Sequence, residues 1–524
     1  MSGLIHYFIE KQAANTPNAA ALIYKKATFT YSELASHISQ TAAGFISLGL
    51  QPSERIATYL PKLPETVFSI FGTPKAGGVF VPVNPLLKPN QVSYILKDCN
   101  VRILVTSSDR LRLLSDALAE CHDLRAIILI DNKKASVQEL HAIEVLNWDQ
   151  LTGNPPNHKY HRRIDSDMAA ILYTSGSTGS PKGVVLSHKN MVTGANSVAQ
   201  YLENSAEDKL LAVLPFSFDY GLSQLTTAFS VGASVVLMDY LLPRDVVRAI
   251  AQHQITGLAA VPPLWNQLTQ FEWSEEAVTS LRYMTNSGGA MPKATLNSLR
   301  ATLPNSKFYL MYGLTEAFRS TYLPPEEIDN RPDSMGKAIP NAEVMVIRED
   351  GSHCSPGEPG ELVHRGSLVS LGYWNDPEKT AKIFKPTPGQ EKALTLPEIA
   401  VWSGDRVKMD ADGYLYFIGR KDEMIKTSGY RVSPTEIEEA IYSSRLVSEA
   451  VALGLPHPTL GQGILVIVTS ETTLDNDALL AHCKRELPNF MVPHAIKKAD
   501  SLPRNPNGKI DRKLLGLKYQ NIFS

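Results

Sequence analysis

A segment rich in glycine and hydroxyl groups runs from residue 173 to residue 184, Tyr173-Thr174-Ser175-Gly176-Ser177-Thr178-Gly179-Ser180-Pro181-Lys182-Gly183-Val184. Apolar runs at 168–172 and 184–186 flank it, so the pattern predicts a loop between two buried strands. Glycine lets the backbone approach a ligand closely, hydroxyl groups donate to phosphate oxygens, and a lysine adds positive charge. We therefore predict a phosphate-binding loop whose contacts come from Thr174, Ser175, Gly176, Ser177, Thr178, Gly179 and Lys182.

A flexible linker is the alternative interpretation of this segment. Linkers seldom lie between two apolar strands or end in Pro181-Lys182-Gly183, which argues against that interpretation. The segment also lacks the Gly-Lys-Ser/Thr ending of a Walker A loop, so a P-loop NTPase fold is disfavoured. The sequence therefore predicts a phosphate loop of another class.

The rest of the first 340 residues alternates between helical and strand patterns. Thr30 and Glu33 form a predicted capping box before a helical pattern that ends at Gly49. Short apolar runs typical of buried strands follow at 101–106, 126–130, 211–214, 233–238 and 308–311. This alternation predicts layered α/β subdomains.

Two other patterns follow along the chain. After about residue 342, short strands and tight turns such as 410–413 predict a small β-rich subdomain. Beyond residue 420, helices are expected at 434–442 and 476–486, with strands at 450–454 and 463–469. We predict an α/β fold with a large N-terminal domain over residues 1–421 and a small, mobile α+β C-terminal domain over residues 422–524.

Composition excludes several classes of protein. The chain has 524 residues, 43% of them hydrophobic and 20% charged, as in globular proteins, and its longest apolar runs fall far short of a membrane span. A net charge of -2 favours neither nucleic acid nor membrane insertion. Because the N-terminus lacks a secretion signal, we expect a cytoplasmic location. The widely spaced cysteines, which predict neither a metal site nor a disulfide framework, are Cys99, Cys121, Cys354 and Cys483.

Five more motifs follow the loop in order. They are Asn286-Ser287-Gly288-Gly289-Ala290-Met291-Pro292, Met311-Tyr312-Gly313-Leu314-Thr315-Glu316, Trp402-Ser403-Gly404-Asp405, Gly419-Arg420-Lys421-Asp422 and Pro503-Arg504-Asn505-Pro506-Asn507-Gly508-Lys509. With the loop, they resemble the adenylate-forming superfamily of acyl-CoA synthetases, peptide-synthetase adenylation domains and firefly luciferase, over essentially the whole chain. Residues 214–225 and 312–325 are most similar to the AMP-forming acyl-CoA ligase of exosortase A systems.

The resemblance implies an enzyme that uses ATP and Mg²⁺ to activate a small carboxylic acid as an acyl-adenylate. Pyrophosphate leaves, and the acyl group passes to CoA or to the phosphopantetheine of a separate acyl carrier protein. An amino-acid adenylation enzyme, a non-catalytic nucleotide-binding relative and a luciferase-like oxygenase are the alternative hypotheses. The acid, the choice of acceptor and the oligomeric state stay open.

The nucleotide site is expected to be shared among the motifs. Glu316 and Thr315 offer oxygen ligands for Mg²⁺, which hard cations prefer. The Tyr312 ring provides a face for adenine, Asp405 can accept both ribose hydroxyls, and Arg420 can reach the sugar or a phosphate. The remaining residues expected to bind the nucleotide are Gly288, Gly289, Ala290, Met311 and Gly313.

Lys509 matches the family lysine that bridges the substrate carboxylate and the α-phosphate, where negative charge builds up. The resemblance further implies that the C-terminal domain swings about a hinge at Asp422. It would present Lys509 for adenylation and then a strand at 427–432 for thioester formation. Ser428, Gly429 and Tyr430 would then flank a tunnel for the thiol.

The acid pocket is less determined by the sequence. Asp219, after Phe218, would bind the α-ammonium group of an amino acid or would cap the following helix. Arg319 would pair with a second carboxylate on the substrate or would belong to a structural ion pair. The other pocket candidates are Tyr220, Ser223, Pro263, Met311 and Ser320.

Overall fold

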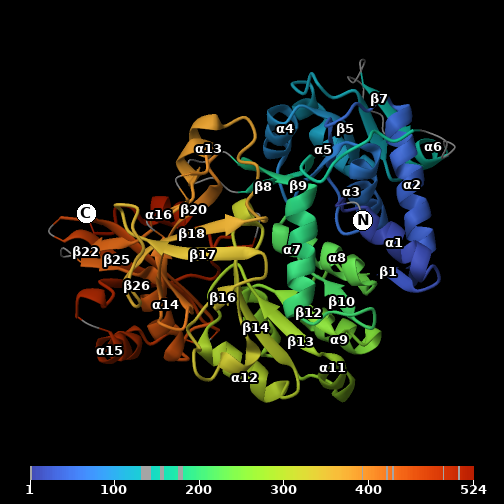
Figure 1. Ribbon diagram of the computed structural model, residues 1–524. Helices are drawn as coiled ribbons and strands as arrows, with labels where there is room; N and C mark the ends of the chain where they lie inside the picture. The colour runs from blue at the N-terminus through green and yellow to red at the C-terminus, as the bar shows by residue number, and fades with distance from the viewer. Residues whose placement is uncertain are drawn as a thin grey trace.

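The computed structural model describes residues 3–131, 143–153, 159–174, 181–391, 393–420, 423–427, 430–458, 460–471, 473–487, 489–505 and 508–523. Within these residues the strands form sheets of nine, seven, five and five strands. The two larger sheets and their helices build the N-terminal part of the molecule (Figure 1). The α/β class predicted from the sequence is confirmed.

The nine-stranded sheet carries the edge at which the candidate site lies. Its strand order is β16-β15-β14-β13-β12-β10-β11-β1-β2, with parallel pairing from β14 to β1 and antiparallel pairing at both edges. The strands are β1 (Ala20–Tyr24), β2 (Ala27–Thr30), β10 (Lys209–Ala212), β11 (Ser234–Leu237), β12 (Gly257–Ala260), β13 (Tyr283–Asn286), β14 (Lys307–Tyr312), β15 (Thr321–Leu323) and β16 (Lys337–Ala338). Because parallel strands end at one edge, the loops after β12, β13 and β14 are brought together there.

The seven-stranded sheet, in the order β7-β6-β5-β3-β4-β8-β9, is parallel except for its last pair. Its strands are β3 (Arg55–Thr58), β4 (Val79–Pro82), β5 (Val101–Thr106), β6 (Ala126–Leu129), β7 (Glu144–Asn147), β8 (Met168–Thr174) and β9 (Lys182–Ser187). Thr174 pairs with Lys182 in the antiparallel β8–β9 register. The predicted phosphate loop therefore connects two neighbouring strands, as its flanking apolar runs indicated.

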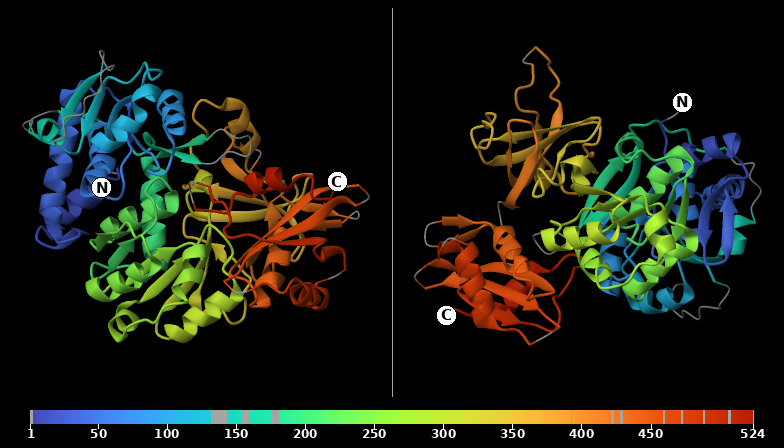
Figure 2. Two further views of the ribbon diagram at one scale, coloured as in Figure 1. Left: turned by 180° about the vertical axis from the view of Figure 1, so that it is seen from behind. Right: turned by 90° about the horizontal axis from the view of Figure 1, so that it is seen from below.

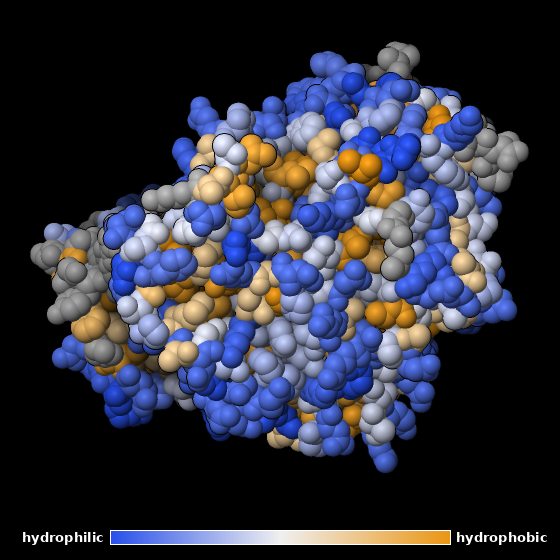
Figure 3. Space-filling view, viewed as in Figure 1, coloured by the Kyte–Doolittle hydropathy of each residue, from blue (hydrophilic) through white to orange (hydrophobic). Residues whose placement is uncertain are grey.

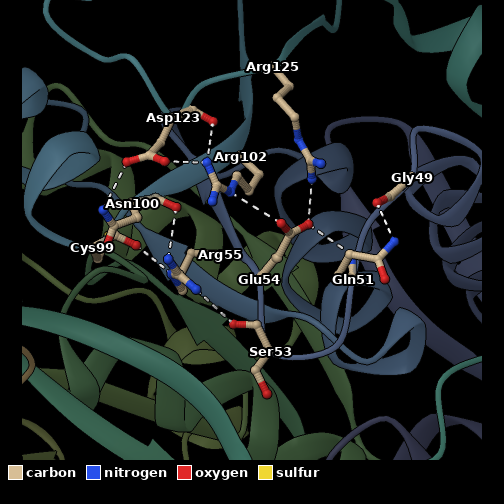
Figure 4. Close-up of polar contacts among 10 residues, drawn as sticks. All are labelled: Gly49, Gln51, Ser53, Glu54, Arg55, Cys99, Asn100, Arg102, Asp123 and Arg125. Carbon is tan, nitrogen blue, oxygen red and sulfur yellow. Dashed lines mark hydrogen bonds and ion pairs between the residues drawn. The ribbon is translucent and has the colours of Figure 1, made fainter.

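Ion pairs and hydrogen bonds connect neighbouring strands at one end of this sheet (Figure 4). Glu54 pairs with Arg102, whose Nε lies 3.2 Å away, and with Arg125. Arg102 also pairs with Asp123, and Arg55 donates to the Asn100 carbonyl oxygen at 3.1 Å. These contacts join the starts of β3 and β5 to the segment before β6. Because the charged groups are partly exposed, we expect each pair to add little stability.

The β-rich part predicted after residue 342 is an antiparallel sheet, as expected. It consists of β17 (Ala342–Ile347), β18 (Gly360–Gly366), β19 (Phe384–Pro386), β20 (Ile399–Met409) and β21 (Leu415–Arg420). The predicted turn at 410–413 joins β20 to β21, and Gly413 has a φ of 84° that favours glycine. Within this hairpin Asp405 lies opposite Arg420.

The C-terminal region forms a body of its own beside the β-rich part (Figure 2). Its elements are β22 (Ile425–Thr427), β23 (Tyr430–Val432), α14 (Pro434–Ser443), β24 (Glu449–His457), β25 (Gly461–Thr469), α15 (Asn476–Glu486), η3 (Asn489–Met491), β26 (Ala495–Lys498) and α16 (Arg512–Tyr519). The expectation of one strand over 427–432 is wrong, because Thr427 and Tyr430 pair across the β22–β23 hairpin. The domain boundary between residues 421 and 422 lies outside the described residues and stays a prediction.

The remaining helices pack against the sheets or link them. They are α1 (Tyr7–Asn15), α2 (Tyr31–Ser47), α3 (Pro64–Ala76), α4 (Pro89–Asp98), α5 (Ser108–Leu118), α6 (Trp148–Thr152), α7 (His188–Tyr201), α8 (Asp219–Val231), α9 (Pro243–His253), α10 (Pro262–Leu268), α11 (Glu275–Ser280), α12 (Lys293–Thr302), η1 (Thr315–Ala317), η2 (Pro325–Glu327) and α13 (Pro377–Ile383). At the start of α2, Thr30 and Glu33 form the predicted capping box. Local sequence signals thus determine this helix end.

The visible surface is mostly hydrophilic, with hydrophobic residues in small separate groups (Figure 3). Among the described residues, none of the helices has both the length and the apolar content that a bilayer crossing requires. All four cysteines are free thiols, and three of them are buried.

Candidate active site

The site is centred on the turn after β13, where a lysine of the C-terminal region meets the N-terminal sheet. Gly288 has a φ of 81°, and a Cβ there would lie 3.6 Å from Lys509 Cε. The same position is 3.4 Å from Val261 Cγ1, after β12, and 3.9 Å from Phe218 Cζ, before α8. Glycine therefore suits this turn, because it tolerates the positive φ.

Charged groups of both parts of the molecule surround Lys509. Surrounding protein atoms desolvate its ammonium group and lower its pKa, and Arg420 adds to this, while Asp219, Asp405 and Glu423 act in the opposite direction. The residue keeps an exposed surface, so this desolvation is partial. Asp219 is the carboxylate with the strongest attraction for the ammonium group. Lys509 thus lies among groups from both parts of the chain.

A second cluster lies beside the ends of β8 and β9. Tyr373 donates a 2.6 Å hydrogen bond to Glu316 Oε1, and the Lys182 ammonium lies 5.6 Å above the centre of the Tyr373 ring. Burial and, after it, the neighbouring Lys379 together lower the pKa of Lys182 to about 8, against the opposing effect of Glu316. Two ammonium groups side by side repel each other, so this arrangement favours an anion.

A third cluster joins the nine-stranded sheet to the β-rich part. The Tyr312 hydroxyl, at the end of β14, donates to Asp405 Oδ2, and Arg420 Nε lies 3.1 Å from Asp405 Oδ1. Burial raises the pKa of Asp405, while Arg420, Tyr312 and Lys509 lower it. Asp405 is buried between strands, whereas Arg420 is half-exposed. The pair therefore presents an acceptor and a cation close together.

The fourth cluster is a buried ion pair. Arg319 Nη1 donates to Asp219 Oδ2 at 2.9 Å, and Thr315 Oγ1 donates to Asp219 Oδ1 at 3.3 Å. The side chains of Arg319 and Asp219 are only 2% and 4% exposed. The helix-cap interpretation of Asp219 is wrong, because Phe218 occupies the N-cap of α8 and Asp219 is its first residue. Of the two interpretations of Arg319, this structure contains the ion pair.

Two family matches cover most of the chain. The AMP-binding enzyme family matches residues 9–374, and the AMP-binding enzyme C-terminal domain matches residues 436–509. The chain belongs to the AMP-binding enzyme family. The adenylate-forming resemblance is thereby confirmed, whereas the narrower likeness to the exosortase-associated ligase is not.

Individual relatives of this AMP-binding enzyme differ in size. Tyrocidine synthase 3 of Brevibacillus parabrevis is 30% identical over 99% of the chain and 8% of its own length. The long-chain-fatty-acid–CoA ligase of Escherichia coli O157:H7 is 27% identical over 97% of the chain and 93% of its own length. The chain spans 6–11% of the length of the first curated relatives that it matches.

A solved structure similar to this AMP-binding enzyme is that of the anthranilate CoA ligase AuaEII in complex with anthranoyl-AMP. The TM-score is 0.88 at 24% identity, with coverage of 99% of this chain and 98% of the other. A likeness over the whole of both chains shows that the fold is shared.

Other residues expected in the acid pocket of the AMP-binding enzyme lie on α8 and α10. The Tyr220 and Thr285 hydroxyls share a 2.5 Å hydrogen bond, and the Ser223 and Thr227 hydroxyls lie 3.4 Å apart. Pro263 is half-buried in the first turn of α10. Ser320 is tied to the buried His364 by a 2.9 Å hydrogen bond and is therefore a structural contact. The Tyr220 side chain thus connects α8 to β13.

The remaining nucleotide candidates lie on neighbouring turns. Gly289 and Ala290 are exposed in the turn after β13, and Gly313 follows β14. Met311 is buried, with its sulfur 3.0 Å from the Tyr201 hydroxyl. Among these candidates, Gly289 and Ala290 are thus exposed to a ligand, whereas Met311 is buried.

Sequence reasoning missed two residues of this site, Tyr373 and Lys379. Lys379 lies in the first turn of α13, where its backbone N–H donates to Asp376 Oδ1 at 3.0 Å. A basic residue in a first helical turn opposes the helix dipole, and that signal was available in the sequence. The contact between Tyr373 and Glu316 spans 57 residues, so no local pattern could reveal it.

The other predicted site residues belong to the phosphate loop, the hinge and the thiol path. Ser175, Gly176, Ser177, Thr178, Gly179, Asp422, Ser428 and Gly429 lie outside the described residues. Tyr430 begins β23. The neighbours of the phosphate loop, Thr174 and Lys182, lie beside each other at its base.

Proposed function

We propose that this AMP-binding enzyme is an acid–thiol ligase of the acyl-CoA synthetase type. It converts a carboxylic acid and ATP into an acyl-adenylate and pyrophosphate, then transfers the acyl group to a thiol and releases AMP. The observation that carries this proposal is the position of Lys509 beside Gly288, among residues of both parts of the chain. The match over nearly the full length of a fatty-acid–CoA ligase supports it.

The chemistry of the clusters fits a nucleoside triphosphate. Lys182 and Lys379 provide paired positive charge for phosphates, together with the loop residues that the sequence predicts. Asp405 and Arg420 would hold the ribose, and Tyr312 with the glycine-rich turn would hold adenine. Bound Mg²⁺ would neutralise phosphate charge, and Glu316 with Thr315 supplies oxygen atoms of the kind that this ion prefers.

Lys509 is proposed as the catalytic residue of the first half-reaction. When the carboxylate attacks the α-phosphorus, negative charge grows on the phosphate oxygens. An ammonium group held near that position stabilises the charge more strongly when water is partly excluded. The partial desolvation of Lys509 supports this role.

The second half-reaction requires the C-terminal region to move. We infer a hinge at Asp422, at the proposed boundary between domains 1–421 and 422–524, and a thiol path beside Ser428, Gly429 and Tyr430. The acceptor is CoA or the phosphopantetheine of a separate carrier protein, since both end in the same thiol. We also propose that the enzyme acts in the cytoplasm, as the sequence predicts.

Acid-dependent ATP–pyrophosphate exchange tests the first half-reaction. We expect exchange with at least one class in a panel of fatty, aryl, dicarboxylic and amino acids. Lys509→Ala should reduce exchange by about 100-fold or more, because it removes a charge that stabilises the transition state. ATP binding, measured by calorimetry, should remain.

Lys484→Ala is the matched control, because Lys484 is an exposed lysine of the same C-terminal region on α15. It should exchange at the wild-type rate. Equal exchange by the Lys509 variant and the wild type would overturn the assignment of Lys509, and no exchange with any acid would overturn the proposed activity.

A further inference from the structure

We propose that Arg319 takes the place beside Asp219 that a substrate ammonium group would occupy, so that the acid activated by this enzyme carries no α-ammonium group. The inference rests on the proposed function and narrows its substrate class. It concerns the choice between amino acids and other carboxylic acids, which the sequence left open.

Asp219 lies where the acid is expected to bind. It follows Phe218, whose Cζ is 3.9 Å from the position of a Cβ on Gly288, and Lys509 Cε is 3.6 Å from the same position. The Lys509 ammonium group is attracted more strongly by Asp219 than by the other carboxylates near it. A carboxylate in this place is available to a cation of the substrate only when no cation of the protein already holds it.

Arg319 already forms an ion pair with the Asp219 carboxylate. Its Nη1 lies 2.9 Å from Asp219 Oδ2, and the other carboxylate oxygen accepts from Thr315 Oγ1 at 3.3 Å. Both charged side chains are at least nine-tenths buried. Each partner therefore neutralises the other inside the protein, away from competing water.

The balance of charges argues against a third cation. In the complex with an acid, Lys509 is balanced by the reacting carboxylate, and Arg319 is balanced by Asp219. An α-ammonium group would add positive charge with no anion left to pair with it. An ion that is buried without a counterion is strongly destabilised, so binding of such a substrate is disfavoured.

The structure also makes displacement of Arg319 difficult. Nη1 donates a second hydrogen bond, of 3.0 Å, to the Phe318 carbonyl oxygen, and the guanidinium carbon lies 4.8 Å above the centre of the Tyr220 ring. An ammonium group that took Asp219 would leave the guanidinium buried without its counterion.

The backbone before Arg319 is held in an unusual conformation. Phe318 has a φ of 57° and a ψ of -50°, which is rare for a residue with a side chain. Its ring fills the space beside Gly194, where a Cβ would lie 2.4 Å from Phe318 Cδ1. Strain of this kind persists only where the surroundings enforce it, so the position of Arg319 is set before substrate arrives.

The test uses pairs of acids that differ only in an α-amino group. Suitable pairs are leucine with 4-methylpentanoate, phenylalanine with 3-phenylpropanoate, and glutamate with glutarate. For the wild-type protein we expect ATP–pyrophosphate exchange to be at least about tenfold faster with the member lacking the amino group, because the ammonium group would be unpaired. Faster exchange with the amino acids would overturn the inference and leave the proposed function standing.

Two variants separate the effect of the charges of Arg319 and Asp219 on substrate preference from the effect of the shape of the site. Arg319→Met frees the Asp219 carboxylate, so the preference should shift toward the amino acids by about tenfold or more. The double variant Asp219→Asn with Arg319→Met has no charged side chain at either position. It should therefore keep the wild-type preference for acids that lack an α-amino group. An unchanged preference in Arg319→Met would overturn the inference.

If Arg319→Met does not fold, the inference is still tested by the exchange rates of the wild-type protein and of the double variant with the same pairs of acids. A double variant that came to prefer amino acids would contradict the charge argument. No exchange by the wild-type protein with any acid would overturn the proposed function and this inference together, whereas a preference for amino acids would overturn the inference alone.

Discussion

Lys509 of the C-terminal region packs beside Gly288 of the N-terminal sheet, 3.6 Å from the position that a Cβ would take there. A methyl group on Gly288 would be strained by the left-handed backbone and would lie in van der Waals contact with the lysine. We expect Gly288→Ala to destabilise the protein by about 1 kcal/mol through its φ of 81° and, in addition, to slow ATP–pyrophosphate exchange. Denaturant unfolding and exchange rates measure the two effects separately.

Gly351→Ala is the control for that substitution. Gly351 has a φ of 87°, and a Cβ there would have no neighbour within 4 Å. It should lose similar stability without any loss of exchange. If both variants lose the same fraction of activity, the contact with Lys509 does not matter for catalysis.

A pH effect is expected from Lys182, whose pKa is lowered to about 8 by burial and then by Lys379. Since only the charged lysine attracts phosphate, kcat/KM for ATP should fall as the pH rises through about 8. Lys379→Met removes the neighbouring positive charge and should move this fall to higher pH. A pH profile of initial rates measures the midpoint.

Lys382→Met serves as its control, because Lys382 is an exposed lysine of the same helix. It should keep the wild-type midpoint. Identical midpoints in all three proteins would show that Lys379 does not influence Lys182.

Local sequence patterns predicted much of this fold, because some of its determinants are local. The capping box of Thr30 and Glu33 needs only four consecutive residues, and α2 begins where it predicts. Asp405 and Arg420 are likewise brought together by one hairpin whose turn the sequence marks. Contacts between residues close in sequence could therefore be predicted without the structure.

The electrostatic partners in the site could not be predicted in this way. Asp219 and Arg319 are 100 residues apart, and either one alone had two sensible roles. Only the three-dimensional structure shows that Asp219 and Arg319 are in contact and that the carboxylate is already paired. The prediction of a single strand over 427–432 was wrong for a related reason, since its pattern does not show that residues 430–432 pair antiparallel with residues 425–427.

The hydrogen bond from Tyr373 to Glu316 predicts a change in metal dependence. The 2.6 Å bond orients the carboxylate proposed to bind Mg²⁺. Tyr373→Phe removes it and should raise the Mg²⁺ concentration for half-maximal exchange by about fivefold, the equivalent of about 1 kcal/mol. A magnesium titration of the exchange rate provides the measurement.

Tyr416→Phe removes a comparable hydroxyl, which donates to Asp410 at 3.0 Å in the β-rich part. It should leave the magnesium titration unchanged. If Tyr373→Phe shifts only the stability, the tyrosine supports the fold and does not orient Glu316 for the metal.

The ion pair of Asp208 with Arg282 predicts how stability depends on pH. Arg282 Nη2 lies 2.8 Å from Asp208 Oδ2, and Asp208 is 4% exposed. Burial would raise the Asp208 pKa, but hydrogen bonds from Arg282, Asn204, Ser205 and Thr256 outweigh it and lower the pKa overall. Because the folded pKa lies below the ordinary value of about 4, this stabilisation is present above pH 4 and is lost as the pH falls through the folded pKa.

Asp208→Asn should therefore cost about 3 kcal/mol at pH 7, since it leaves Arg282 without its counterion. The difference in unfolding free energy between variant and wild type should shrink in acid, where the wild-type carboxylate also loses its charge. Urea unfolding of both proteins at pH 7 and at successively lower pH measures this difference in unfolding free energy. A difference that stayed constant down to the acid-unfolding limit would mean that packing, and not the charge of Asp208, stabilises the start of β10.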